Sequence, residues 1–294
     1  MASTADQWDI VSSVGLTALG VAAARALEGH RADALVRDEF AERFVTAARP
    51  PVPMPTRPEE GLPDWWRWLA DFLAVRSRFF DEYFAEATGA GITQVVVLAA
   101  GLDARAHRLD WPAGCEVFEV DQPAVLRFKD EVFDEAGAVP ACTRHVVAAD
   151  LREDWVGALH AAGFDPERPT AWLVEGLLTY LPASADERLF TEIDRLSAPG
   201  SRVGVEYVAD VEAVLADPRF QAASREYGMD VRELWSREPR RPVAERLRAL
   251  GWDVRAETVA DAADRYGRVL DEAPRVLFGD PVVLLTGTRL RACR

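Results

Sequence analysis

Hydrophobic and polar positions follow a helical pattern in the first 90 residues of this chain. Ser12–Leu27 is rich in Ala, Leu and Val, Asp33–Val45 mixes charged and apolar residues, and Trp65–Thr88 carries apolar residues at helical spacing. A proline cluster over residues 50–58 separates the last two segments, because proline cannot continue a helix. We therefore expect three helices and one extended connector before residue 90.

From residue 92 the pattern changes to short β-rich runs separated by helix-length segments. Five runs predict strands: Gln94–Ala99, Glu116–Val120, Arg144–Ala149, Ala171–Val174 and Arg202–Val205. Helices are predicted between them at Pro123–Ala136, Trp155–Ala162 and Ala185–Leu196, and two late strands at Trp252–Glu257 and Val282–Gly287. Strands that alternate with single helices form right-handed βαβ units. The fold class is therefore α/β, with a doubly wound, seven-stranded and mostly parallel sheet.

The pattern divides residues 1–294 into the parts of a single domain. We expect a helical cap over residues 1–90, a ligand-binding core over 92–206 and closing strands over 251–294. Residues 207–250 are charged and helical, without a strand signal, and are predicted to be an insertion. The cap and this insertion would lie above the strand ends and form a lid.

Composition narrows the possible partners and the location. The chain has 49 acidic and 34 basic residues and a net charge of −15, which disfavours binding to the phosphates of a nucleic acid. No apolar run approaches the roughly 20 residues that a membrane helix needs, and no basic region precedes an apolar one at the N-terminus. Cys115, Cys142 and Cys293 suit neither a disulfide framework nor a zinc site. We expect a cytoplasmic protein without a metal; the pattern says nothing of its oligomeric state.

Acidic residues follow four of the predicted strands. Ligands of open α/β sheets bind beyond the carboxyl ends of the strands, where Asp103, Asp121, Asp150 and Glu175 would lie. Asp121 can accept two hydrogen bonds from a ribose diol. Any one of these acids alone has an ordinary structural alternative, such as capping the helix that follows Asp150. Their occurrence at successive strand ends favours a ligand.

The loop after the first strand has no phosphate cradle. Gly101 allows the backbone to approach a ligand, although by itself it is an ordinary turn glycine. The loop lacks both G-x-G-x-x-G and G-x-x-x-x-G-K-[ST]. Leu151, after the third strand, offers an apolar wall for a flat base. A nucleoside ligand without phosphate fits these features, and a nicotinamide dehydrogenase fits them less well.

Three runs at these strand ends closely resemble one family. They are QVVVLAAGLDARAHRL (94–109), VFEVDQPAVL (117–126) and VEGLLTYLP (174–182), and the similarity extends to residues 8–19, 75–83 and 283–289. The chain resembles the leucine carboxyl methyltransferase-like class I S-adenosylmethionine (SAM)-dependent methyltransferases. Its similarity is greatest to the bacterial branch that includes polyketide carboxyl O-methyltransferases of the tetracenomycin type.

The resemblance implies a seven-stranded methyltransferase sheet and a SAM site. The SAM contacts would fall on Ala99, Gly101, Asp103, Asp121, Gln122, Asp150, Leu151 and Glu175. Ala99 departs from the family, in which many relatives carry Gly there, and His107 stands where an aromatic residue is common. Neither departure removes a charge that SAM needs.

The helix predicted over residues 65–88 places one arginine among apolar residues. One face carries Phe72, Arg76, Phe79, Phe80 and Tyr83, and a more polar face carries Asp71, Arg78 and Glu82. A buried guanidinium must meet an anion. That anion is either a core carboxylate or the carboxylate of SAM or of the acceptor. The resemblance favours the ligand, since relatives use an arginine on this helix, and Arg78 is the alternative.

Four further aromatic residues are candidates for the acceptor side. Tyr180 follows Glu175 by five residues and would lie near the transferred methyl group, or would simply pack. Tyr207, Tyr227 and Trp235 belong to the predicted insertion, where they would line an acceptor pocket or form the core of the lid.

The histidines favour one acceptor chemistry. His30, His107, His145 and His160 all precede the region where many phenol methyltransferases place a base. A phenol, with a pKa near 10, needs such a base, whereas a carboxylic acid, with a pKa near 4, is already ionised. We therefore expect SAM-dependent O-methylation of a small-molecule carboxylate in bacterial, including secondary, metabolism. Methylation of a phenol or other hydroxyl, and a methyltransferase-like protein recruited to another reaction or to binding, remain alternatives.

Overall fold

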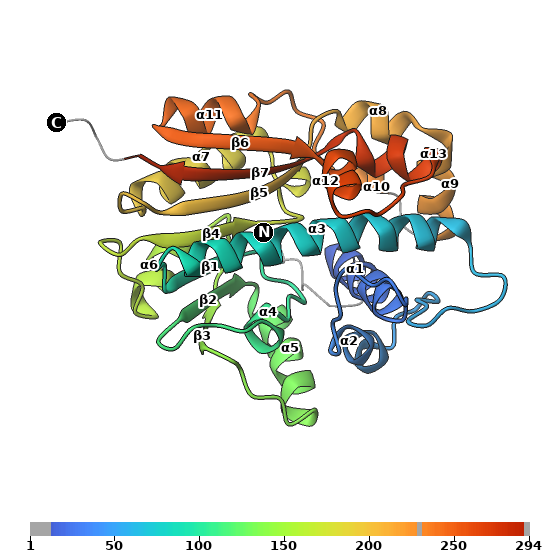
Figure 1. Cartoon of the computed structure of the whole chain (residues 1–294), viewed down its shortest axis with the longest axis horizontal. Helices are drawn as coiled ribbons and strands as arrows, with labels where there is room; N and C mark the ends of the chain where they lie inside the picture. The colour runs from blue at the N-terminus through green and yellow to red at the C-terminus, as the bar shows by residue number, and fades with distance from the viewer. Residues whose placement is uncertain (1–12, 228–230, 291–294) are drawn as a thin grey trace, which may run out of the picture.

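A seven-stranded sheet forms the centre of the computed structural model, which describes residues 13–227 and 231–290 (Figure 1). The strands are β1 (Gln94–Leu98), β2 (Glu116–Asp121), β3 (Thr143–Ala148), β4 (Thr170–Val174), β5 (Arg202–Val208), β6 (Trp252–Thr258) and β7 (Val282–Arg289). Their order in the sheet is β3-β2-β1-β4-β5-β7-β6. Only β7 runs antiparallel to its neighbours in this sheet. The prediction of a doubly wound, mostly parallel sheet is confirmed.

Helices precede, connect and flank these strands. They are α1 (Ser13–Gly29), α2 (Ala41–Ala48), α3 (Asp64–Gly89), α4 (Arg105–Arg108), α5 (Pro123–Glu135), α6 (Trp155–Ala161), α7 (Ala183–Arg195), α8 (Val211–Ala216), α9 (Pro218–Glu226), α10 (Val231–Leu234), α11 (Val243–Ala249), α12 (Val259–Arg265) and α13 (Glu272–Pro274). A short 3₁₀ turn, η1 (Leu178–Tyr180), follows β4, and a π turn, η2 (Arg275–Gly279), precedes β7.

The two faces of the sheet pack into two separate layers. Val95 and Val97 of β1 belong to the cluster that includes α3 and α12, whereas Val96 and Leu98 belong to the cluster that includes α6, α7 and α11. This is the alternation that a strand covered on both faces requires. Gly204 of β5 lets α3 lie close, because a Cβ there would be 3.2 Å from the rings of two α3 aromatic residues.

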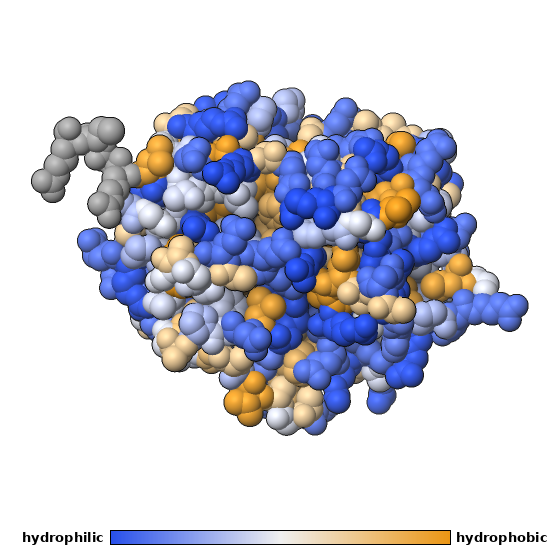
Figure 2. All heavy atoms as spheres, in the orientation of Figure 1, coloured by the Kyte–Doolittle hydropathy of each residue, from blue (hydrophilic) through white to orange (hydrophobic). Residues whose placement is uncertain are grey.

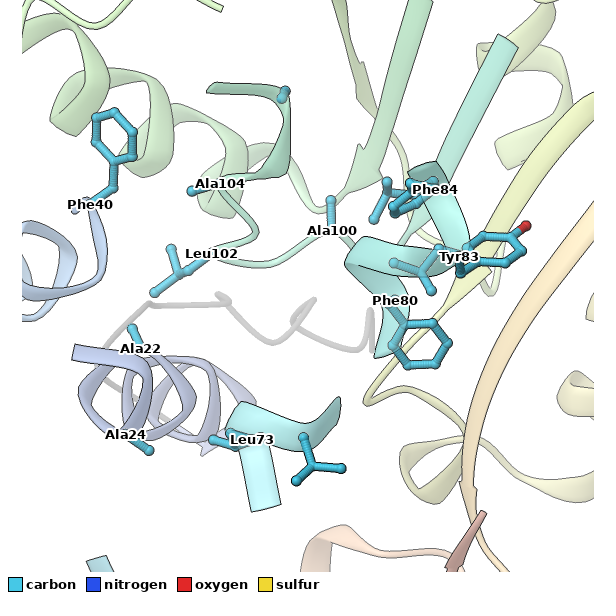
Figure 3. Packing of buried hydrophobic residues seen from close by; sticks show 14 of the residues in the cluster. Ala22, Ala24, Phe40, Leu73, Phe80, Tyr83, Phe84, Ala100, Leu102 and Ala104 are labelled. Carbon is cyan, nitrogen blue, oxygen red and sulfur yellow. The ribbon is translucent and has the colours of Figure 1, made fainter. Parts of the chain in front are cut away.

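The long helix α3 joins the sheet to the N-terminal helices. Figure 3 shows Phe80, Tyr83 and Phe84 of α3 near Ala100, which follows β1. The hydroxyl of Tyr83 donates to the carbonyl of Trp172 on β4 at 2.9 Å. Because α3 is fixed against the sheet in this way, every side chain along it has a defined position relative to the strand ends.

The helix predicted over Asp33–Val45 is shorter than expected. Helix α2 begins at Ala41 instead, since Asp38 accepts a hydrogen bond from the backbone of Phe40 at 3.0 Å and Glu28 accepts one from Leu35 at 2.6 Å. Side-chain acceptors of this kind compete with helical hydrogen bonds.

Residues 251–294 contain helices that the sequence analysis did not predict. Helices α12 and α13 and the turn η2 lie between the two closing strands. A capping box formed by Thr258 and Asp261 begins α12, and this T-x-x-D pattern was the available signal.

The helices outside the sheet gather at one end of it. Figure 1 shows α1, α2, α8, α9 and α10 at the end where the parallel strands finish. The face of the molecule in Figure 2 is mostly hydrophilic, with scattered hydrophobic patches. No helix in residues 13–227 and 231–290 combines the length and the apolar character needed to cross a membrane.

Candidate functional site

A cavity of about 750 Å³ lies at the carboxyl ends of β1, β2 and β4, between the sheet and the helices gathered there. The structure brings all ten predicted site residues to its lining: Arg76, Ala99, Gly101, Asp103, Asp121, Gln122, Asp150, Leu151, Glu175 and Tyr180. Their roles stay predictions. Arg78 is not in the lining, because it pairs with Glu82 at 2.9 Å on the exposed side of α3.

The loop after β1 turns sharply through two residues of left-handed backbone. Ala99 has a φ of 53° and Gly101 a φ of 46°. This conformation is free for glycine but costs an L-residue such as Ala99 about 1–2 kcal/mol. The turn is held by the backbone of Ala100, whose N–H donates to the carbonyl of Val120 at 3.1 Å. The loop is thereby tied to the end of β2, next to Asp121.

Asp121 is oriented by the backbone at both of its oxygens. Oδ2 accepts a hydrogen bond from Gly101 N and Oδ1 accepts one from Gln122 N, each at 2.6 Å. A carboxylate has about four lone-pair sites, so both oxygens retain acceptor capacity. Burial raises the pKa of Asp121 above its ordinary value, although the two backbone donors oppose the shift. This carboxylate can therefore accept a pair of hydroxyl groups.

Arg105 organises the acids around the first strand loop. Its Nη1 bonds both Asp103 and Glu175, the latter at 2.7 Å, and its Nε bonds Asp81 at 2.8 Å. Burial opposes ionisation of Asp103, but the guanidinium of Arg105 holds the pKa of Asp103 down to about 2. The sequence analysis missed Arg105; its position two residues after Asp103 was the only local signal.

Arg76 lies between two carboxylates. Its Nε is 2.8 Å from Glu175 Oε1, and its Nη1 donates to Glu206 Oε2 at 3.3 Å. The structure thus supplies the core carboxylates of the first alternative. The Nε–H is nevertheless buried without a properly directed acceptor among the described residues. Arg76 therefore lines the cavity with its charge balanced by two acids, and its Nε–H is not exposed to the cavity.

Glu206 is a site residue that the sequence analysis did not name. It lies near the end of β5, is 6% exposed and accepts a hydrogen bond from Gly176 N at 2.8 Å. Burial raises its pKa above the ordinary value, although Arg76 opposes the shift. The rule that found the acids after the first four strands would have found it, because it directly follows the fifth predicted strand.

Asp150 does not cap the helix that follows it, so that alternative is wrong. Asp154 caps α6 and accepts from Gly157 N at 2.9 Å. Asp150 bonds Arg152 instead, with Nη2 at 2.6 Å from Oδ2, and this hydrogen bond lowers the pKa of Asp150 to about 2. It remains an ionised acceptor beside the apolar side chain of Leu151.

The part of the cavity away from the strand ends is apolar and aromatic. Its lining includes Trp65, Trp68, Leu69, Phe72, Phe220, Tyr227, Trp235, Leu277 and Phe278. Tyr227 meets Trp65 edge to face, with ring centroids 5.7 Å apart, and its hydroxyl donates to the carbonyl of Leu16 at 2.5 Å. This side chain connects the insertion to α1 and α3.

Tyr207, which the sequence suggested as a lining residue of the acceptor pocket, does not line the cavity. Along β5, Glu206 and Val208 line the cavity, and Tyr207 packs with the hydrophobic cluster on the other face of the sheet. Of the insertion helices, α8, α9 and α10 contribute lining residues, whereas α11 packs against β6. The polar faces of α3 also differ from expectation, because Asp71 is buried and bonds Arg268 at 2.8 Å.

Histidine is absent from the described lining of the cavity. His107, which stands at a family departure, stacks on Phe133 with ring centroids 3.6 Å apart. Burial lowers the pKa of His107 to about 4, so its ring is neutral and packs as an aromatic residue. In the described ranges 13–227 and 231–290, no group of three His, Cys, Asp or Glu side chains could hold a metal ion.

Comparison with known families places this chain beside SAM-dependent methyltransferases. A family model described as leucine carboxyl methyltransferase matches residues 18–194. A protein of Saccharopolyspora erythraea, named as a proposed SAM-dependent methyltransferase, is 48% identical over 275 residues, which cover 94% of this chain and 96% of that protein. A similarly named protein of Rhodococcus jostii is 49% identical over 284 residues, covering 94% and 95% of the two chains.

Solved structures support the fold. A crystal structure of a proposed methyltransferase from Thermobifida fusca YX matches with a TM-score of 0.56 and 20% identity, and the match covers 92% of this chain and 94% of that one. At this identity the similarity concerns the fold alone.

Proposed function

Because this chain belongs to the leucine carboxyl methyltransferase family and is a SAM-dependent methyltransferase, we propose that it methylates the carboxylate of a small, largely apolar molecule. One observation carries the proposal: a buried arginine, Arg76, lines a cavity whose lining combines acids at the strand ends with aromatic side chains from the helices. We place the enzyme in the bacterial branch of tetracenomycin-type carboxyl methyltransferases, with a role in bacterial, including secondary, metabolism.

The residues at the strand ends fit SAM. Asp121 would hold the ribose hydroxyls through its remaining lone pairs, and Asp150, Leu151 and Gln122 would surround the adenine. Ala99, Gly101 and Asp103 would form the loop beside it. When bound, SAM supplies a methyl group on a positively charged sulfur.

Arg76 and Glu175, which both line the cavity, form a paired positive and negative charge with 2.8 Å between Nε and Oε1. Such a pair complements a group that carries both a carboxylate and an ammonium, as the amino-acid part of SAM does. The guanidinium of Arg76, which lines the cavity, would serve this carboxylate or that of the acceptor. In either case Arg76 orients an anion without donating or accepting a proton.

The apolar walls would prepare a carboxylate acceptor. An acid with a pKa near 4 reaches the site already ionised, so the chain needs only to hold one oxygen in position and remove water from it. Trp68, Phe72 and Phe278 offer such a dry surface. Tyr180, which lines the cavity, would position the reacting oxygen through its hydroxyl, and burial raises the pKa of Tyr180, which keeps that hydroxyl protonated.

A hydroxyl acceptor is the second candidate, and Glu206 favours it. Glu206 lines the cavity, and burial raises its pKa above the ordinary value, which favours a role as a proton acceptor. In this case Glu206 would take the proton of a phenol or alcohol as the methyl group is transferred.

The test uses SAM labelled in its methyl group and a panel of aromatic acids, fatty acids and phenols. A carboxylate acceptor gives a methyl ester, which alkali cleaves to labelled methanol, whereas a methyl ether survives alkali. We expect alkali-labile label, with activity lost in Arg76→Ala and retained in the matched control Arg78→Ala. Alkali-stable label would refute the carboxylate and support the second candidate. Tight SAM binding without any product would support the alternative of a protein recruited to binding.

A further inference from the structure

Residues 236–240, which follow α10, form hydrogen bonds with the turn that carries Tyr180. Arg240 donates from Nη1 to the carbonyl of Leu178 at 2.7 Å and from Nη2 to the carbonyl of Leu181 at 3.0 Å. These two carbonyls lie at the beginning of η1 and immediately after it. One guanidinium from the insertion therefore spans the whole turn.

The same segment makes two further contacts with this turn and the helix after it. Ser236 N donates to the carbonyl of Thr179 at 2.7 Å, and Ala183 N donates to Glu238 Oε2 at 2.6 Å. Residues 236–240 thus bind the backbone on both sides of Tyr180. Inside the turn, Leu181 N donates to the carbonyl of Leu178 at 3.2 Å, whereas the carbonyls of Thr179 and Leu181 receive donors from residues 236–240.

The ion pair of Arg240 does not explain its position. Its Nη1 is 3.2 Å from Asp186 Oδ2, but Arg246 already bonds both oxygens of Asp186, at 2.9 and 3.1 Å. Asp186 is fully buried, and Arg246 satisfies its charge without help. Arg240 differs from Arg246 in its hydrogen bonds to the two carbonyls of the turn, those of Leu178 and Leu181.

The other side of the turn faces the cavity. Thr179, Tyr180 and Leu181 all line it, and so do Glu175 and Gly176 just before the turn. Backbone carbonyls bound by the insertion and residues that line the cavity therefore occur in the same short stretch.

We propose that Arg240 is a positioning residue, which fixes η1 so that Tyr180 faces the acceptor and which makes the insertion and the loop at Glu175 one rigid unit. The consequence is coupling between the two halves of the cavity: order in residues 236–240 supports the loop that contacts the cofactor. The proposal rests on the proposed assignment of this cavity to cofactor and acceptor.

Hydrogen exchange of the protein without ligand tests the positioning directly, and calorimetry with S-adenosylhomocysteine tests the coupling. The variants are Arg240→Met, Arg240→Lys and the matched control Arg241→Met, whose arginine is 58% exposed and pairs with Glu187 at 3.3 Å. We expect the amides of residues 177–181 and 183 to exchange on the order of 10-fold faster in Arg240→Met, as loss of hydrogen bonds from a charged donor implies. The affinity for S-adenosylhomocysteine should fall several-fold in Arg240→Met. It should fall less in Arg240→Lys and stay unchanged in Arg241→Met.

Two results would overturn the proposal. One is unchanged exchange at residues 177–183 in Arg240→Met; the other is faster exchange spread evenly over the sheet, which indicates a merely structural arginine. If Arg240→Met does not fold, Arg240→Lys decides on the same criteria, because it keeps the charge beside Asp186. Failure of the methylation assays would leave the exchange result intact, so the two proposals fail separately.

Discussion

Replacing Asp121 tests the cofactor site most directly. The two oxygens of this carboxylate are held by backbone N–H groups of Gly101 and Gln122, each at 2.6 Å, and they face the cavity. Asp121→Ala removes the acceptors that would bind the ribose while leaving both backbone donors beside the cavity, where water can reach them. Asp121→Asn keeps the shape but places an amide NH₂ against one of these donors, so it should not restore binding.

The expected loss follows from the hydrogen bonds removed. A hydrogen bond to a charged acceptor contributes about 1.5–3 kcal/mol, and each 1.4 kcal/mol is tenfold in affinity. Asp121→Ala should therefore weaken S-adenosylhomocysteine binding by about 10- to 150-fold. Because burial raises the pKa of Asp121, the wild-type affinity should also fall on acidification at a higher pH than an ordinary aspartate would give.

Isothermal titration calorimetry with S-adenosylhomocysteine measures the effect. The matched control is Asp110→Ala, which removes the same charge from an exposed position nearby in the sequence. Thermal unfolding of both variants first establishes that they fold. An Asp121→Ala protein that folds and binds with wild-type affinity would refute the assignment of the ribose to the end of β2.

Three further results are expected. Gly20→Ala should destabilise the protein by about 1–3 kcal/mol by overpacking, because its Cβ would be 2.3 Å from the hydroxyl of Tyr227. The cost should largely vanish when Gly20→Ala is made in a Tyr227→Ala background, and additive costs in thermal unfolding would contradict this. Arg268→Met leaves the buried carboxylates of Glu28 and Asp71 without their common partner and should cost about 3–5 kcal/mol in urea unfolding. The half-exposed control Arg275→Met should cost little, and equal losses would count against the buried network. Burial raises the pKa of Glu206, so its contribution to stability is present below the unfolded pKa of about 4.3 and is lost as the pH rises through the folded value. Glu206→Gln should therefore gain stability relative to wild type as the pH rises from about 4 to about 7. A stability difference that does not change with pH would disprove this.

Local pattern was sufficient for the strands and for most of the helices. The predicted strand Gln94–Ala99 ends one residue early, at Leu98, because Ala99 adopts left-handed backbone. The helix predicted over Trp65–Thr88 is observed as Asp64–Gly89. Hydrophobic period is a local property, so a single sequence shows it wherever burial is regular. Where side chains compete with the backbone, as Asp38 does before α2, the period misleads.

The candidate site divides in the same way. The acids at strand ends follow from sequence and the strand-end rule together, and the resemblance correctly identified the family and the cofactor. The bonds of Arg105 to Asp81 and Glu175 join residues 24 and 70 positions apart, and no local pattern contains them.

The sequence by itself determined the kind of sheet, the edge at which the candidate site lies and the acids that meet there, because these depend on periodicity and on the order of elements along the chain. Only the tertiary structure decided which charges neutralise one another and which residues line the cavity. Arg76 and Glu206 are 130 residues apart, and Tyr227 and Leu16 are 211 apart, yet both pairs are in contact. Such pairs arise from the packing of α3 and the insertion over the sheet, and packing depends on the whole fold rather than on any one segment.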